Sequence, residues 1–384
     1  MRGVILQQIK SNRLPSLDLA RFVAMLLMVQ GHTIYAMIAP DQISGSDSWE
    51  IWGWIRGFTA PMFLTVSGIV QVFANGRNED GKLKSNLIKR RIRAALIVLI
   101  IGYLLAFPAG RIFDLPFIQY KYWSYFFRVN ILQLIGITLL WSLFYFKITK
   151  NDKSLMILSF STFIITTVLT PFASDISQIL SLPEMFDAYL HSGTGSLFPI
   201  IPYSAYLFFG VSLGILIKSW EKEEREKNII KYFILGGFVF ILFSLIFSSG
   251  NSKVWSFLTG FSGNNPFIIF LREGFVMIAI GSLTILHLFI KKWSDIYSMF
   301  GRHALFLYVL HLIIIYGGDG LFGLKQNFGL NTFSANESVI CAGFVLLLSL
   351  GIIWIYNYYS SNYKFGKIAF HSLPILYLGY MLLI

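Results

Sequence analysis

The sequence predicts an all-α fold: a polytopic integral membrane helix bundle of about eleven (10–11) transmembrane helices with a cytoplasmic N-terminus. Three observations predict it. Of the 384 residues, 55% are hydrophobic and only 13% are charged, whereas a soluble domain carries about 25% charged residues. Apolar runs long enough to cross a bilayer recur along the chain. Lysine and arginine gather in alternate connecting segments, as the orientation rule for membrane loops requires.

A bilayer core about 30 Å thick needs roughly 20 apolar residues per helix. The predicted spans are 17–39, 54–75, 94–109, 125–146, 154–173, 199–218, 231–249, 267–290, 303–318, 337–358 and 367–384. The third and ninth are short, and the last is a span or an interfacial segment. The first span carries ionisable residues and lacks a small-residue cleavage site. We therefore expect it to be retained rather than cleaved as a signal peptide.

The basic residues orient these spans. With the N-terminus inside, the cytoplasmic segments hold Arg2, Lys10, Arg13, Arg77, Lys82, Lys84, Lys89, Arg90, Arg91, Arg93, Lys147, Lys150, Lys153, Lys218, Lys222, Arg225, Lys227, Lys231, Lys291, Lys292, Arg302, Lys364 and Lys367. The opposite side holds Arg111, Lys121, Lys253 and Lys325. Such a bias is typical of cytoplasmic loops in the inner (cytoplasmic) membrane.

The connecting segments suggest no separate soluble domain, so residues 1–384 are expected to form a single domain. Apolar and basic residues alternate in 81–93, which indicates an interfacial helix or a solvated basic loop. The charged run 220–227 is expected to be an exposed helix extension. The outer segments 40–53, 110–124, 174–198, 250–266 and 319–335 are long enough to fold over an extracytoplasmic cavity.

Composition also excludes several function classes. The net charge of +12 is spread between hydrophobic runs, so nucleic acid is not expected as a partner, whereas membrane lipid is. Cys341 is the only cysteine, which excludes an internal disulfide and a thiolate metal cluster. No glycine-rich phosphate loop and no Cys/His set with zinc spacing occurs, so no metal is expected.

The first span contains the most informative polar residues. Asp18 and Arg21 are three residues apart and share a helix face. His32 returns to that face about 16 Å further along the helix axis. Imidazole is the usual general base near neutral pH, so His32 is a candidate to deprotonate an attacking hydroxyl or amine. A structural histidine, with Asp18 and Arg21 only holding helices together, is the alternative.

Ionisable groups at span depth are functional candidates in general because they are costly to bury. Arg128 and Gln133 begin the fourth span, and Arg272 and Glu273 lie near the start of the eighth. Adjacent residues point about 100° apart, so the last two are expected to serve different neighbours. His311 lies in the ninth span. His287 and His303 are expected to be interfacial, and Arg56 is expected to reach back to the interface.

Five segments resemble, in order, the membrane proteins of the heparan-α-glucosaminide N-acetyltransferase-like family. This family belongs to the transmembrane acyltransferase superfamily and is related to acyltransferase-3. The segments are Arg13–His32 with the pattern SLDxxRxxAxxxMxxxH, Phe58–Gly68, Arg128–Gly136, Leu197–Gly210 and Phe300–His311. The resemblance covers 13–311. Phe22, Leu134 and Tyr203 depart from the family pattern. The histidine at position 32 follows the bacterial branch, because the eukaryotic branch has asparagine there.

The resemblance implies transfer of an acyl group, expected to be acetyl, from cytoplasmic acyl-CoA to a hydroxyl or amine of an extracytoplasmic glycan in the cell envelope. On this hypothesis His32 and Asp18 are catalytic. Arg21, Arg90 and Arg91 would hold the phosphates of acetyl-CoA or another acyl-CoA by charge-assisted bonds. Gln133, Arg128, Arg272 and His311 would stabilise the oxyanion or bind substrate.

Two other functions stay open at this stage. A multi-pass transporter of a small anion or sugar derivative would use the same buried charges as a substrate pathway, and inverted repeats with broken helices would favour it. A non-catalytic partner in glycan biosynthesis would bind neither acyl donor nor solute. The sequence also leaves open whether the chain is a monomer or a homodimer.

Overall fold

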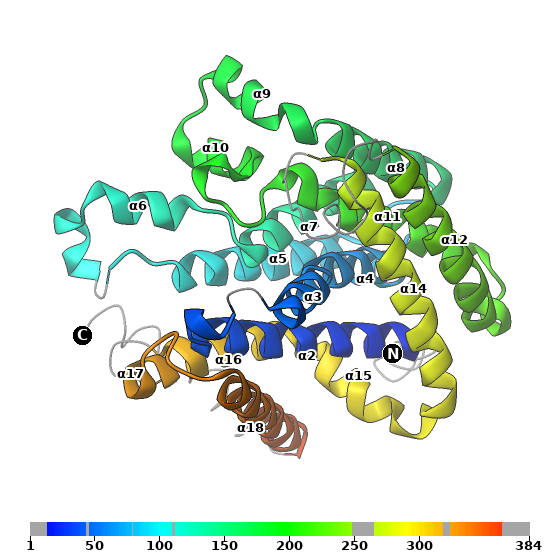
Figure 1. Ribbon diagram of the computed structural model, residues 1–384. Coiled ribbons are helices and arrows are strands. Elements are labelled where there is room, and N and C mark those ends of the chain that lie inside the picture. The colour runs from blue at the N-terminus through cyan, green and yellow to red at the C-terminus, as the bar shows by residue number, and fades with distance from the viewer. Residues whose placement is uncertain are drawn as a thin grey trace. The chain divides into compact units, whose positions relative to one another are not determined.

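The protein is helical throughout the part that the structure describes. The computed structural model describes residues 14–43, 46–78, 80–109, 112–247, 265–317 and 323–362. These residues form α-helices and short 3-10 helices, together with two isolated β-bridges (Figure 1). The chain divides into two compact units. Unit 1 comprises 1–20, 60–106 and 123–291, and unit 2 comprises 21–59, 107–122 and 292–384.

Seven described helices are long and apolar enough to cross a membrane, and the number rises to nine if each of two bent pairs counts as one span. These nine coincide with nine of the eleven predicted spans. The predicted span 94–109 overlaps the second half of α5 (Ser85–Leu105), whose first turns carry four cationic side chains, so α5 is not among these nine. The predicted span 367–384 lies outside the described residues. The chain is therefore a multi-pass helical membrane protein.

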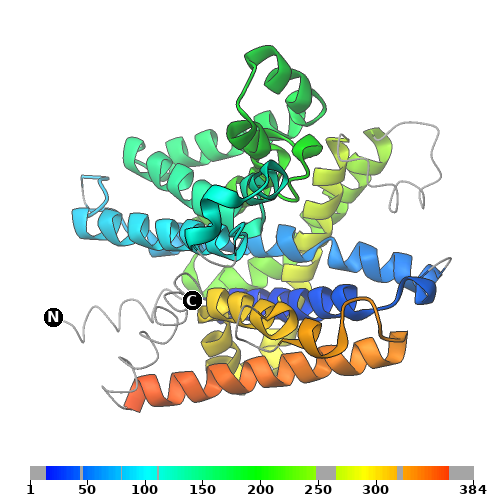
Figure 2. The ribbon, with the colours of Figure 1, turned by 90° about the vertical axis from the view of Figure 1, so that its left-hand side faces the viewer.

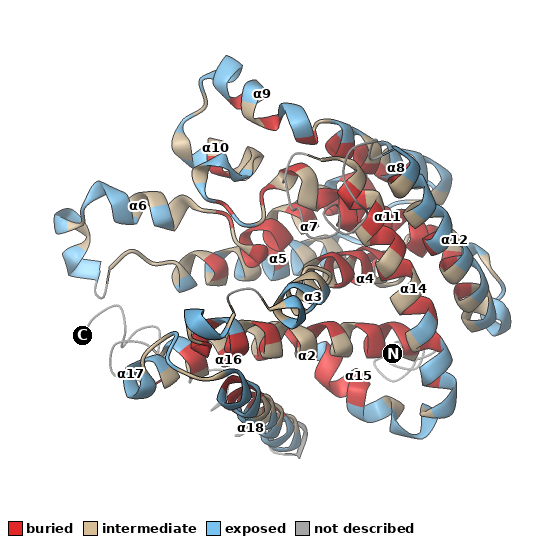
Figure 3. Ribbon diagram, in the orientation of Figure 1, coloured by how far each residue is buried: buried red, intermediate tan, exposed pale blue. Residues whose placement is uncertain are grey.

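Unit 1 contains most of the long helices. They are α4 (Thr59–Ala74), which begins at the unit boundary, α5, α7 (Ile131–Ile148), α8 (Asp152–Val168), η3 (Thr170–Phe172), α9 (Ala173–Leu180), α10 (Glu184–Leu190), η4 (Ser192–Thr194), α11 (Ile200–Ser219), η5 (Lys222–Glu224), α12 (Arg225–Phe247) and α14 (Phe267–Phe289). Helix α11 is apolar on all sides and is buried along most of its length (Figure 3). It packs against α4, α7, α8, α12 and α14 and forms the centre of this unit.

Glycines allow these helices to approach closely. A Cβ atom at Gly68 of α4 would lie 2.1 Å from the Leu207 carbonyl oxygen of α11, and one at Gly210 of α11 would lie 2.1 Å from the Thr65 carbonyl oxygen. Gly237 of α12 and Gly274 of α14 meet in the same way. Association of helices in lipid depends on such small residues, because apolar side chains gain little from leaving lipid for a helix interface.

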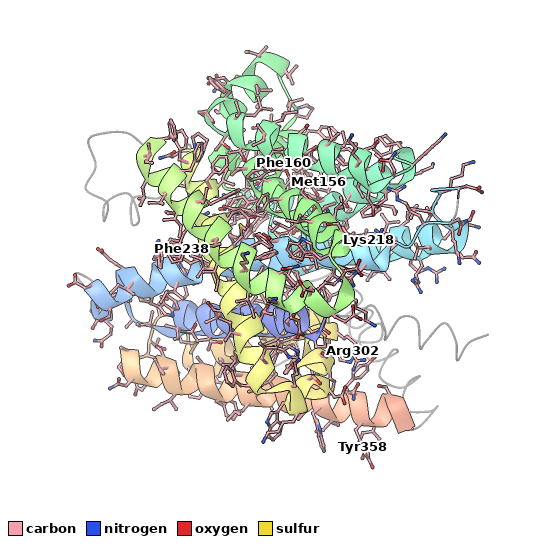
Figure 4. All side chains as sticks on the ribbon, turned by 90° about the vertical axis from the view of Figure 1, so that its right-hand side faces the viewer. Met156, Phe160, Lys218, Phe238, Arg302 and Tyr358 are labelled. Carbon is pink, nitrogen blue, oxygen red and sulfur yellow. The ribbon has the colours of Figure 1, made fainter. Side chains whose placement is uncertain are left out.

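The outer helices of unit 1 present apolar side chains to the surroundings. Met156 and Phe160 of α8 and Phe238 of α12 are exposed, and Figure 4 labels all three. Exposed apolar residues at this density would aggregate in water, whereas lipid solvates them. This surface agrees with a membrane setting.

Unit 2 contains the remainder of α2 (Pro15–Met37), η1 (Pro40–Gln42), α3 (Asp47–Arg56), η2 (Ile112–Phe117), η6 (Lys291–Trp293), α15 (Ser294–Arg302), α16 (Ala304–Tyr316), α17 (Leu324–Phe328) and α18 (Ala335–Asn362). Helices α6 (Tyr120–Phe127), α2 and η6 cross the boundary between the units. Helices α16 and α18 lie side by side (Figure 2). Segment 331–333 donates three backbone hydrogen bonds to the Ala36 and Met37 carbonyls, which satisfies free carbonyls at the end of α2.

Three local details refine the expectations from the sequence. Residues 85–93 of the basic segment 81–93 and the apolar residues after them belong to one continuous helix, because nothing interrupts α5 between Ser85 and Leu105. The charged run 220–227 is not a plain helix extension, since Trp220 has extended backbone angles and ends α11 before η5 begins. Two spans are bent, by 50° between α8 and the η3–α9 segment and by 65° between α15 and α16.

Candidate active site

Two histidines from distant parts of the sequence meet inside unit 2. His32 lies five residues before the end of α2, and His311 lies in the middle of α16. The Nδ1 atom of His32 is 2.9 Å from the Nε2 atom of His311. His311 is fully buried, whereas His32 is partly exposed. The pair therefore has a fully buried member and a partly exposed member.

The hydrogen bonds fix the tautomers of the neutral pair. The Nδ1 atom of His311 lies 2.9 Å from the Leu307 carbonyl oxygen, which can only accept, so Nδ1 of His311 carries the proton. Its Nε2 atom must then accept from Nδ1–H of His32. The remaining lone pair of His32 is on Nε2, for which no described residue is a hydrogen-bond partner. His311 thus holds His32 in the tautomer of a general base.

Tyr308 forms one wall of this pair. Its ring lies edge-on to both imidazoles, with centroids 6.2 Å from His32 and 5.4 Å from His311. The edge-to-face arrangement fixes ring orientation without using the nitrogen atoms. Tyr308 belongs to the sequence motif Phe300–His311 but had no role assigned from the sequence. Its position three residues before His311, which puts both on one face of α16, was the available signal.

Asp18 and Arg21 lie one turn apart near the start of α2. Asp18 is buried and Arg21 is partly buried, and both have interaction partners in the structure. Arg21 lies about 16 Å before His32 along the helix axis, at 1.5 Å per residue. The stripe of polar residues predicted for this helix is therefore present on one continuous α-helix.

The two arginines predicted to bind the cofactor differ in their surroundings. Arg90 is exposed near the beginning of α5. Arg91 is partly buried and donates from Nη2 to the Ala74 carbonyl oxygen at the end of α4, 2.9 Å away. Burial, followed by the charge of Arg90, lowers the pKa of Arg91 from its ordinary value. Arg91 therefore also joins α4 to α5, and Arg90 is the freer of the two to meet a phosphate.

Gln133 and Arg128 both belong to unit 1 but have different neighbours. Gln133 in α7 is fully buried beside Gly102 of α5, and neither atom of its amide has a partner among the described residues. Arg128, before α7, stacks its guanidinium 3.9 Å from the Tyr125 ring centroid. Gly195, which has a positive φ of 87°, packs against the same guanidinium. A Cβ atom added at Gly195 would lie 2.8 Å from the Cζ atom of Arg128. The structure does not place Gln133 and Arg128 in one cluster.

Arg272 and Glu273 of α14 contact different neighbours, as expected from adjacent helix positions. The Arg272 guanidinium interacts with the hydroxyls of Tyr203 and Tyr206 in α11. Glu273 is fully buried, and its Oε1 accepts a hydrogen bond of 2.9 Å from the Thr65 hydroxyl of α4. Its Oε2 has no partner among the described residues. The role of Thr65 could not be read from the sequence, which does not show that α4 and α14 meet.

The other histidines have structural partners. His287 is buried in α14 and pairs with Glu226 of α12 at 3.0 Å. His303, between α15 and α16, lies against the Tyr356 ring. His191, which the sequence did not distinguish, pairs with Asp187 at 2.7 Å and accepts from the Gly193 amide at 2.8 Å. None of the three contacts the His32–His311 pair in the described structure.

No group of three or more His, Cys, Asp or Glu side chains suited to a metal ion occurs in the described ranges. The His32–His311 pair, open at Nε2 of His32, can accept a proton from an attacking nucleophile.

Comparison with known families agrees with the sequence motifs. The family model described as heparan-alpha-glucosaminide N-acetyltransferase, catalytic, matches residues 13–247, which is more than half of the chain. The match includes α2 with His32, and it ends before α16 with His311. No curated protein and no solved structure matches the chain.

Proposed function

Because the chain belongs to the heparan-α-glucosaminide N-acetyltransferase catalytic family, we propose that it transfers an acetyl group from acetyl-CoA to a hydroxyl or amine of an extracytoplasmic glycan. Membership identifies a membrane acetyltransferase domain, and acetyl-CoA is the acyl donor of this family. The observation that carries the proposal is the His32–His311 hydrogen bond, which leaves Nε2 of His32 free to accept a proton.

The chemistry follows from that arrangement. Nε2 of His32 takes the proton of the acceptor hydroxyl or amine as its oxygen or nitrogen attacks the thioester carbon. The carbon–sulfur bond then breaks, and the imidazolium returns the proton to the departing thiolate, which gives acetylated acceptor and free CoA. During the cycle His311 keeps accepting from Nδ1–H of His32, so the ring does not rotate. The acid–base cycle needs no other proton carrier.

The orientation of the bundle supports transfer across the membrane. We propose that the N-terminus is cytoplasmic and that the protein lies in the cytoplasmic membrane, as in the bacterial branch of the family. The concentration of Lys and Arg in alternate loops supports this topology. Arg21 and Arg90 then lie on the side where cytosolic acetyl-CoA arrives. The predicted roles of Asp18, Gln133, Arg128 and Arg272 stay predictions that single substitutions can test.

The direct test uses full-length protein purified in detergent. We expect His32→Ala to lose acetyl transfer by about 10²–10⁴-fold, which is the usual contribution of a general base. The variant should still be stabilised against heat by CoA, because ligand binding to the native state raises apparent stability. His303→Ala is the matched control, since that imidazole lies against Tyr356 in the same unit. Full turnover in His32→Ala would remove His32 from the mechanism.

A transporter is the second candidate, because the two bent spans are a feature of transporters as well. The same stability measurement separates the two functions. An acetyltransferase is stabilised by CoA, whereas a transporter of a sugar derivative is stabilised by its solute and not by CoA. Stabilisation by neither CoA nor any solute would favour the non-catalytic role.

A further inference from the structure

A cluster of aromatic rings surrounds one cation beside the candidate active site. The Arg56 guanidinium, at the end of α3, lies 4.5 Å from the Tyr35 ring centroid and 4.9 Å from that of Trp52. Trp49 stacks on Trp52 with centroids 4.7 Å apart and on Tyr35 at 6.4 Å. All four residues belong to unit 2. Tyr35 is 56% exposed, so the cluster is open to a ligand at this ring.

The positive charge of Arg56 has no anionic partner among the described residues. No described carboxylate forms an ion pair with it, and no described atom accepts a hydrogen bond from its guanidinium. The aromatic rings cover its faces through cation–π contacts. They leave the N–H donors at its edge, whose planar fork matches a carboxylate or a phosphate. A partly buried cation with unused edge donors is suited to bind an anion.

The cluster contains a second unused donor. The indole Nε1–H of Trp52 is buried and has no hydrogen-bond partner among the described residues. A buried donor without an acceptor costs free energy, and a bound ligand oxygen would remove that cost. Arg56 and Trp52 thus supply donors of two kinds, and Tyr35 supplies an exposed aromatic surface.

This cluster borders the histidine pair. Tyr35 lies one turn after His32 on α2, which puts both on the same helix face. The aliphatic part of the Arg56 side chain packs on Gly31, the residue before His32. A Cβ atom added at Gly31 would lie 3.1 Å from Cγ and from Cδ of Arg56. A ligand held by Arg56 and Tyr35 would therefore extend to the imidazole of His32.

We propose that Arg56, Trp52 and Tyr35 form a subsite for an acceptor sugar that carries an anionic group, either a carboxylate or a phosphate. The proposal rests on the proposed acetyl transfer at His32. Arg56 and Trp52 hold the anionic group, and the pyranose ring lies against Tyr35. The acceptor is assigned here rather than the donor because Tyr35 lies about 21 Å beyond Arg21 along α2, at 1.5 Å per residue. On the proposed topology, Arg21 faces the cytosol and Arg56 faces the acceptor compartment.

The test measures thermal stabilisation of the full chain in detergent by three probes: glucosamine, glucosamine 6-phosphate and inorganic phosphate. Glucosamine represents the sugar in the family description. We expect glucosamine 6-phosphate to bind at least about tenfold more tightly than the other two, because only it engages both the cation and the ring. In Arg56→Gln, glucosamine 6-phosphate should no longer bind more tightly than glucosamine. In Tyr35→Ala, it should no longer bind more tightly than inorganic phosphate.

Two controls separate this subsite from the catalytic proposal. Arg302→Gln removes the same charge from an exposed position of unit 2 (Figure 4) and should keep the preference for the sugar phosphate. His32→Ala should lose acetyl transfer but keep that preference, because binding does not need the base. Failure of His32→Ala to lose turnover would refute the mechanism while leaving the subsite intact.

Four results would overturn the subsite. Equal binding of glucosamine and glucosamine 6-phosphate would show that no anion is recognised. A preference that survives in Arg56→Gln would place the anion elsewhere. Absence of stabilisation by any of the three probes would leave the cluster as an aromatic belt at the membrane interface. Loss of CoA-dependent stabilisation in Arg56→Gln would assign the cation to the donor.

Discussion

His311 illustrates how one buried side chain can set the chemistry of another. It presents an acceptor to Nδ1–H of His32 because its own Nδ1–H is donated to the Leu307 carbonyl. His311→Ala would leave Nδ1–H of His32 without that acceptor and allow the ring to change tautomer. A lost hydrogen bond of this kind costs about 1–3 kcal/mol, which corresponds to roughly 10–100-fold in rate.

We therefore expect His311→Ala to lower kcat by about 10–100-fold with little change in the KM for acetyl-CoA. His311→Gln should retain more activity than His311→Ala, since its amide oxygen can accept from Nδ1–H of His32. Steady-state kinetics of the two variants make the comparison. Equal losses in both would mean that His311 contributes packing and not an acceptor.

The buried carboxyl of Glu273 gives a second prediction at the level of single residues. Thr65→Val keeps the side-chain shape but removes the hydroxyl that donates to Glu273. We expect a loss of about 1–3 kcal/mol of stability, because the buried oxygen loses its donor. Thr138→Val is the matched control, since that buried hydroxyl bonds only to carbonyls of its own helix. Thermal unfolding in detergent should show a clearly lower midpoint for Thr65→Val, and equal midpoints would contradict the argument.

Among the helices, the contact of α4 with α11 depends on glycines rather than on side-chain interdigitation. Gly210→Ala would place a methyl group 2.1 Å from the Thr65 carbonyl oxygen, so the two backbones must separate. Gly343→Ala, in α18, meets nothing within 4 Å. The substitution Gly343→Ala should stabilise the folded protein by about 0.5–1 kcal/mol, because alanine loses less backbone entropy in a helix than glycine does.

The two glycine-to-alanine substitutions should therefore change the unfolding midpoint differently. We expect Gly210→Ala to lower the unfolding midpoint of the detergent-purified protein and Gly343→Ala to leave it unchanged or raise it. Destabilisation of similar size at both positions would show that lipid packing around the helices governs the effect, and not the approach of α4 to α11.

The sequence predicted individual helices well because lipid demands a long apolar run for each span. At α5 the helix begins earlier than the predicted span 94–109, because the cationic turn around Arg90 is continuous with the apolar stretch after it. The meeting of His32 with His311 was beyond a single sequence, since hydropathy does not reveal which helices are neighbours. The same holds for Thr65 with Glu273. It also holds for Arg56 with Tyr35, which lie on the successive helices α3 and α2.

For the whole molecule, the proposed function depends on the two sides of the membrane. Lys82, before α5, and Phe117, at the end of η2, are both exposed, and the basic-loop topology places them on opposite sides. A background without native cysteine is available through Cys341→Ser, because Cys341 is the only cysteine. Lys82→Cys and Phe117→Cys then provide single thiols at two accessible positions.

In intact cells, a membrane-impermeant maleimide should label Phe117→Cys and should leave Lys82→Cys unlabelled until the membrane is permeabilised. The reason is electrostatic: Lys82 lies in a segment with six other basic residues between 77 and 93, which favours retention on the cytoplasmic side. Cys341→Ser alone controls for background labelling. If Lys82→Cys reacts first, the orientation is reversed, and acetyl-CoA would have to reach Arg21 from outside the cytosol. Transfer from cytosolic acetyl-CoA to an outer glycan would then be impossible in the proposed direction.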